Sequence, residues 1–220
     1  MSFDTAAVRD SLPIVAAGAG LTLGLVAGAL AIGTGIGLLA CAGRLLGRGA
    51  LYHLSSAYIA LFRALPETVL IFWLYYCGPL ILNGKLSAFQ SGTVALAIPA
   101  GAYLAEIFRA GIQAVPRGHV EAGRALGLSP FWLVRDVIAP QAVRIMIPAF
   151  LGIVTILIKN SALVSAIGVE ELFYRATVHA GQTFRYFELL TTAAVIYFLL
   201  ILPLSVLVQR RERRLLARVW

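Results

Sequence analysis

The sequence predicts an all-α membrane protein with about five transmembrane helices and one loop of two short helices on its inner side. Three observations favour this fold class: 60% of the 220 residues are apolar, only 13% are charged, and the mean hydropathy is +0.88. A soluble domain needs about 25% charged residues to keep its surface in water. The composition therefore excludes an ordinary soluble globule.

The first helix is expected within residues 12–42, because no charged residue occurs in the 33 positions from Ser11 to Gly43. About 20 apolar residues suffice to cross a bilayer. Residues 1–11 contain acidic residues rather than a basic leader and form an extracytoplasmic N-terminus. Small residues at four-residue spacing predict close packing against a helix of this chain or of a second subunit: Gly20, Gly24 and Gly28, then Gly33 and Gly37.

The later helices follow from four further runs without charge, at 68–84, 86–105, 145–158 and 189–209. They are expected near 56–82, 86–107, 142–165 and 188–209, so that residues 12–209 form a single transmembrane domain. With five spans the termini lie on opposite sides. If the basic tail 210–220 is cytoplasmic, 12 of the 18 basic residues are on the inner side, as the positive-inside rule requires.

The segment 109–140 is the one long stretch polar enough for water, and it lies on the inner side in this topology. Helix breaks are expected near Pro116, at Gly127 and before Pro140. A short helix at Glu121–Leu126 would end on Gly127, and Ser129-Pro130 would begin the next helix. Such a compact excursion suits docking of a partner; a helical hairpin lying on lipid is the alternative.

The inner segment carries a recognisable pattern. Glu121-Ala122-Gly123, three further residues, Gly127 and then Val137-Ile138-Ala139-Pro140 resemble the EAA loop of permease subunits of bacterial ATP-binding cassette (ABC) importers. Three stretches are similar to the branch of that family that imports polar amino acids (histidine, arginine, glutamine or opines): Phe62–Glu67, Ala102–Gly118 and Lys159–Leu172.

The resemblance implies a type I ABC importer permease fold in the bacterial inner membrane. It implies that the loop couples to a separate ATPase subunit through Glu121, Ala122, Gly123, Ala125, Leu126 and Gly127. Implied partners are a second, identical or similar, permease, two ATPase subunits that carry ATP-Mg, and an extracytoplasmic solute-binding protein. From the residues alone, Glu121 caps its own helix or pairs with a basic partner residue, and Gly127 serves backbone geometry.

Charged residues at membrane depth mark a candidate pathway, because an unpaired charge there costs several kcal/mol. Glu67 follows Pro66, which can break the second span at a binding site. Two interpretations stand: Glu67 pairs internally with Arg63, or it faces the cavity and neutralises an amino group of the cargo. By resemblance, an acidic residue here suits basic amino acids or opines.

A second polar cluster, Lys159-Asn160-Ser161, is expected in the fourth span. Three interpretations of Lys159 stand: it binds a carboxylate of the cargo, it neutralises Glu67 or Glu106, or it forms hydrogen bonds with a helix end. Asn160 and Ser161 contact cargo or join helices. Tyr103 is a further candidate cargo contact. Glu106 is expected to pair with Arg109, three residues on.

The remaining candidates are few. Glu170 and Glu171, in a loop expected outside, are possible contacts of the binding protein. Cys41 and Cys77 lack metal-site spacing, the three histidines stand alone, and no GxxxxGK[ST] phosphate loop occurs. The sequence thus predicts no metal, cofactor or catalytic residue in this chain, which is not an enzyme.

These observations favour ATP-driven import of polar, and specifically basic, amino acids or opines by alternating access. The alternative is a secondary transporter driven by an ion gradient through Glu67 and Lys159, although the inverted repeats typical of that class are not visible. A membrane scaffold without transport leaves Glu67 and the inner segment unexplained.

Overall fold

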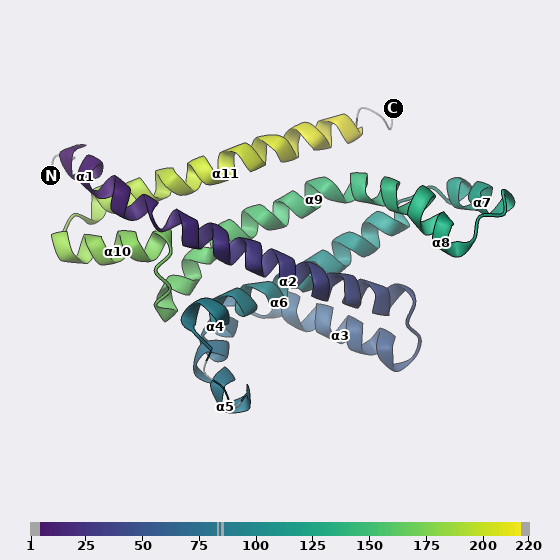
Figure 1. The fold of residues 1–220 in the computed structure, drawn as a ribbon, viewed down its shortest axis with the longest axis horizontal. Coiled ribbons are helices and arrows are strands. Elements are labelled where there is room, and N and C mark those ends of the chain that lie inside the picture. The colour runs from purple at the N-terminus through teal and green to yellow at the C-terminus, as the bar shows by residue number, and fades with distance from the viewer. Residues whose placement is uncertain (1–4, 83, 85, 217–220) are drawn as a thin grey trace.

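The computed structural model describes residues 5–82, 84 and 86–216, and every element in this part of the chain is a helix (Figure 1). The all-α prediction is therefore confirmed. Four helical stretches are long and apolar enough to cross a membrane, and a fifth span results if one sharply bent helix pair is counted. The expected number of about five agrees with this count.

The first span consists of α1 (Thr5–Ala16) and α2 (Ala19–Leu45), which together give a candidate span from Val8 to Leu45. It is longer than the expected 12–42, and it is interrupted next to Gly18. A Cβ atom on Gly18 would lie 2.7 Å from the backbone of Leu172. Glycine is required here because the chain at the start of α10 (Leu172–Thr183) touches this junction.

The glycine spacing in α2 serves packing within the chain. α6 (Ala88–Gln113) crosses α2, and the two helices form the most extensive contact between elements in the described residues. A Cβ atom on Gly33 would lie 3.0 Å from the carbonyl oxygen of Ala97, and one on Gly37 would lie 2.9 Å from Cβ of Leu104. Of the glycines named above, Gly20 faces open space. The partner of this face is therefore α6.

The second span is not the single helix expected over 56–82. It consists of α3 (Ala50–Ala64) and α4 (Glu67–Tyr76), which meet at an angle of 104°, and the short α5 (Gly78–Leu82) follows. Pro66 removes a backbone donor and forces Leu65 into an extended conformation, with ψ of 136°. The break predicted at Pro66 is present, and it redirects the chain.

The third span, α6, is the most deeply buried of the candidate spans. It begins with a capping box, in which Ser87 Oγ accepts from the N–H of Gln90 at 3.2 Å and Gln90 Oε1 accepts from the N–H of Ser87 at 3.0 Å. These two bonds satisfy donors that the first turn leaves free.

The inner segment starts with α7 (Arg117–Ala125), which is longer than the predicted Glu121–Leu126. It ends in a Schellman motif: Gly127 has φ of +76°, its N–H bonds to the Arg124 carbonyl at 3.0 Å, and the N–H of Leu128 bonds to the Gly123 carbonyl at 3.1 Å. The role predicted for Gly127 is confirmed.

The break predicted before Pro140 is absent. The helical run Pro130–Ile167 is continuous and contains α8 (Pro130–Trp132), the π-helix η1 (Leu133–Ile138), α9 (Ala139–Asn160) and the 3₁₀-helix η2 (Ser161–Ile167). Pro140 stands in the first turn of α9, directly after the π-helical turn. The wider turn bonds the N–H of Ala139 to the carbonyl of Val134, five residues back, so the helix continues past a residue without a donor.

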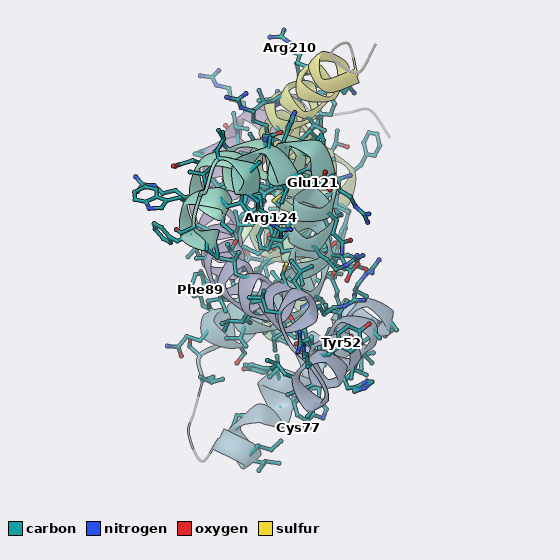
Figure 2. The ribbon with its side chains drawn as sticks, turned by 90° about the vertical axis from the view of Figure 1, so that its right-hand side faces the viewer. Tyr52, Cys77, Phe89, Glu121, Arg124 and Arg210 are labelled. Atoms are coloured by element: carbon teal, nitrogen blue, oxygen red, sulfur yellow. The ribbon has the colours of Figure 1, made fainter. Side chains whose placement is uncertain are left out.

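The last helices are α10 (Leu172–Thr183) and α11 (Tyr186–Leu216), and α11 is longer than the predicted 188–209. Figure 1 places α1 and α10 at one end of the molecule and α7, α8 and the end of α11 at the other. Figure 2 looks at the molecule from the α7 end and labels Glu121, Arg124 and Arg210. The segments for which the sequence predicts the inner side thus lie toward one end of the molecule.

Candidate functional site

The break between α3 and α4 positions Glu67. As the first residue of α4 it lies at a helix N-terminus, where the free N–H groups favour a negative charge. Its side chain is half-buried. A carboxylate is thereby held at a break inside a candidate membrane span.

Asn160 is the partner of Glu67. It is the last residue of α9, and its side-chain amide donates a hydrogen bond to Oε2 of Glu67. Two candidates that are 93 positions apart in the chain are therefore in contact. The amide donates a hydrogen bond but brings no positive charge to the carboxylate.

Arg63 does not pair with Glu67. Its guanidinium carbon lies 5.3 Å from the ring centre of Tyr103 on α6, within the range of a cation–π contact. The internal pair considered from the sequence is therefore wrong, because the bend at Pro66 separates the directions of the two side chains. Tyr103 is occupied by this cation on one side and is 36% exposed.

The other two members of the polar cluster face elsewhere. Ser161 is fully buried, and its hydroxyl donates to the Ile158 carbonyl at 2.8 Å, within its own helix. Lys159 is exposed and lines a cavity of about 280 Å³ with residues of α10 and α11, such as Phe173 and Leu190. It forms no ion pair within the described residues, so it neutralises neither Glu67 nor Glu106.

A charged cluster lies toward the C-terminal end of α6. The predicted pair is confirmed: a guanidinium nitrogen of Arg109 donates to Oε2 of Glu106 at 2.7 Å. Arg44, at the end of α2, also donates to Glu106, a contact that no pattern in the sequence indicates. Two cations thus share one carboxylate, and the same residues tie α2 to α6.

The inner segment presents the EAA-type residues in two ways. Gly123 is buried, and a Cβ atom there would lie 2.6 Å from Leu133, so α7 packs tightly against the following π-helix. The other five candidates are exposed: Glu121, Ala122, Ala125, Leu126, which is 82% exposed, and Gly127. Glu121 is the fifth residue of α7, beyond its first turn, so the capping interpretation is wrong.

His119 does not stand alone as its place in the sequence suggested. Its Nδ1 donates to Oε1 of Gln141 at 2.8 Å, and Nε2 of Gln141 donates to the Val137 carbonyl at 2.8 Å. This bridge fastens α7 to the start of α9. No pattern in the sequence signals it, because 22 positions separate the two residues.

Glu171 is a correction to the predicted outer surface. It is fully buried and caps α10, accepting from the N–H of Tyr174 at 2.8 Å. Its other oxygen accepts from Tyr197 at 2.7 Å and Thr22 at 3.3 Å. A carboxylate enclosed in this way cannot contact a binding protein. The side chain of Glu170 is 63% exposed, so it remains a candidate.

The described residues contain no group of three metal-ligating side chains, and Cys41 and Cys77 are both free thiols.

Residues 33–219 match the profile of the family described as binding-protein-dependent transport system inner membrane component. The glutamine transport system permease protein GlnP of Escherichia coli (strain K12) is 35% identical, over 98% of this chain and 99% of its own length. A putative glutamine transport system permease protein of Rickettsia conorii is 32% identical over 86% of each chain.

Solved structures also resemble the fold. A chain of an amino acid ABC transporter, crystallised with histidines, superposes with a TM-score of 0.87 and is 36% identical, covering 97% of this chain and 100% of its own length. A chain of the inward-facing MetNI methionine ABC transporter gives a TM-score of 0.70 at 24% identity, over 89% and 91% of the two chains. The second likeness concerns the fold alone.

Proposed function

The chain belongs to the family of inner-membrane components of binding-protein-dependent transport systems, and we propose that its cargo is a polar amino acid that carries a positive charge, or an opine. It is a permease subunit of an ABC importer and not an enzyme, and this membership sets aside the ion-gradient-driven secondary transporter. The observation that carries the cargo proposal is the carboxylate of Glu67, held at a helix break by Asn160.

Glu67 supports a cationic cargo because its charge is compensated by a helix N-terminus and one amide rather than by a basic side chain. An ammonium or guanidinium group of the cargo would complete that compensation. The glutamine relatives take, by their names, a neutral amino acid. Asn160 and Tyr103 remain proposed cargo contacts. Ser161 and Lys159 have weaker support, since one is buried and the other lines a separate cavity.

The inner segment is proposed to receive the ATPase. A groove of that subunit would receive the exposed residues Glu121, Ala122, Ala125 and Leu126. Gly123 and Gly127 shape this compact part of the segment, here called the knob (residues 117–128). Glu121 has no ion pair in the described residues and is free to meet a basic group there. Such a knob, fastened by His119 and Gln141, would transmit closure of the ATPase pair to α9.

The assembly would comprise two permease copies or paralogues, two ATPase subunits with ATP-Mg, and a binding protein that contacts the outer end, including Glu170. We place the N-terminus outside and the basic tail, residues 210–220, in the cytoplasm, in line with the excess of arginine in the segments assigned to the inner side. ATP binding would then drive alternating access to Glu67.

Reconstitution in liposomes tests the proposal. The permease, its ATPase subunits and its binding protein should take up radiolabelled L-arginine or L-lysine when ATP is enclosed with the ATPase, and glutamine more slowly. Uptake of glutamine at equal or higher rate than the basic amino acids would refute the cationic cargo. Uptake that follows a proton or sodium gradient without ATP would refute the mechanism.

A further inference from the structure

A second cavity lies on the inner side of the break that holds Glu67. Its volume is about 460 Å³, and α3, α6 and α9 line it through Arg63, Glu106, Gly111, Met146 and Ala149, among others. Eleven positions of α9 separate Ala149 from Asn160, which corresponds to about 16 Å along the helix. The cavity and the Glu67–Asn160 contact are therefore at different depths, and cargo would meet them in succession.

The two charged residues that line the cavity, Arg63 and Glu106, belong to a cluster with more positive than negative charge, which also contains Arg44 and Arg109. Glu106 is already shared by Arg44 and Arg109, whereas Arg63 has no ion pair and no side-chain hydrogen bond among the described residues. Three cations and one anion give this cluster a net charge of +2. Glu106 compensates only part of this positive charge, and a carboxylate that enters the cavity would compensate more of it.

Arg63 is also held in place. The ring of Tyr103 lies 5.3 Å from its guanidinium carbon, a contact that uses the face of the guanidinium and none of its N–H donors. A planar guanidinium fixed in this way can bind a carboxylate with two parallel hydrogen bonds. Lysine would bring the same charge without that geometry.

We infer that the cavity between α3, α6 and α9 is a second cargo site, at which Arg63 binds the α-carboxylate of the amino acid before its release to the inner side. The inference rests on the proposed function. Glu67 recognises the cationic group of the cargo, and Arg63 recognises the α-carboxylate, which all α-amino acids share. Arg63 is thus a binding residue that selects α-amino acids over amines of the same side chain.

The test uses the permease in complex with its ATPase subunits, in lipid nanodiscs without nucleotide or binding protein. Equilibrium binding of radiolabelled L-arginine is compared with that of agmatine, which is arginine without its carboxylate. The wild-type complex should bind arginine about tenfold or more tightly than agmatine, the range of a charge-assisted contact. Arg63→Gln should weaken arginine binding to the level of agmatine and leave agmatine unchanged, while Arg63→Lys should retain part of the difference.

Two controls separate this inference from a structural effect and from the proposed function. Glu67→Gln should weaken agmatine binding and keep the preference for arginine, and Arg175→Gln, at an exposed pair with Glu170, should change neither. The inner site is refuted if Arg63→Gln keeps the preference for arginine over agmatine. It is also refuted if the wild type shows no arginine binding at 10 mM, which would limit the binding free energy to roughly 3 kcal/mol. Failure of the proposed function would appear in a different experiment, the uptake assay, in which liposomes with the wild-type complex would take up no basic amino acid.

Discussion

The amide of Asn160, where α9 ends, donates a hydrogen bond to the carboxylate of Glu67, where α4 begins. One partner follows a proline break and the other precedes a 3₁₀-helix, so two irregular points of the backbone meet at this contact. Irregular backbone at membrane depth is tolerated where it lines a polar cavity or is buried in protein. The contact therefore identifies the place where cargo recognition can be tested directly.

Glu67→Gln should lower ATP-dependent uptake of arginine about tenfold or more, because it removes one charge interaction of roughly 1.4 kcal/mol with the cargo. Glutamine can still accept the hydrogen bond from Asn160, so assembly with the ATPase should be intact by size-exclusion chromatography. Asp10→Asn, at an exposed carboxylate of α1, is the matched control. Normal uptake by Glu67→Gln would restrict Glu67 to a structural role.

Glu171→Ala should destabilise the protein by about 3 kcal/mol, because it removes the cap of α10 and leaves the hydroxyls of Tyr197 and Thr22 buried without their acceptor. Glu170→Ala, the adjacent and exposed position, should change stability by about 0.5 kcal/mol or less. Thermal unfolding of the two purified variants in the same detergent measures the difference. Equal unfolding temperatures would contradict the enclosed carboxylate.

Gly37→Ala should cost about 1–3 kcal/mol, since its Cβ would press on Leu104, Gly101 and Ala105 of α6. Gly35→Ala is the control two positions away, where a Cβ meets nothing within 4 Å and alanine favours the helix. The yield of folded protein and its unfolding temperature report both effects. If the two variants behave alike, α2 does not pack on α6 through Gly37.

Gly127→Ala should cost about 1 kcal/mol, because a side chain is strained at φ of +76°. Since Gly127 shapes the proposed ATPase contact, the variant should also lower the stimulation of ATP hydrolysis by cargo-loaded binding protein. Gly118→Ala, at an open helical position of α7, should leave that stimulation unchanged and slightly favour the helix. Full stimulation in Gly127→Ala would argue against the knob as the contact.

Local signals in the sequence predicted several features correctly. Pro66 indicates the break in the second span, Gly127 the end of α7, and the three-residue spacing the pair Glu106–Arg109. In each case the physical cause acts over one helical turn: a missing donor, a left-handed backbone or two neighbouring side chains. The contact between Glu67 and Asn160 needed the fold, although both residues were candidates because they are polar at membrane depth.

Features that depend on packing between distant elements were missed. Nothing near Glu171 in the sequence indicates that Thr22 and Tyr197 enclose it, so it was assigned to the surface. Pro140 indicated a helix end, because no local pattern in the sequence shows that a π-helical turn accommodates it. That turn belongs to η1, which packs on α7. The pair Arg44–Glu106 joins the ends of two helices that only the crossing of α2 and α6 brings together.

The unbroken helical run from Pro130 to Ile167 reaches from the segment proposed to meet the ATPase to Asn160 beside Glu67. If both sites are as proposed, a tilt imposed at one end would displace the other, and the two ligands of the assembly would be thermodynamically linked. Whatever change in cargo affinity follows ATP binding must be matched by an equal change in ATP affinity when cargo binds. Measured nucleotide affinity thus becomes a readout of an occupied site deep in the membrane.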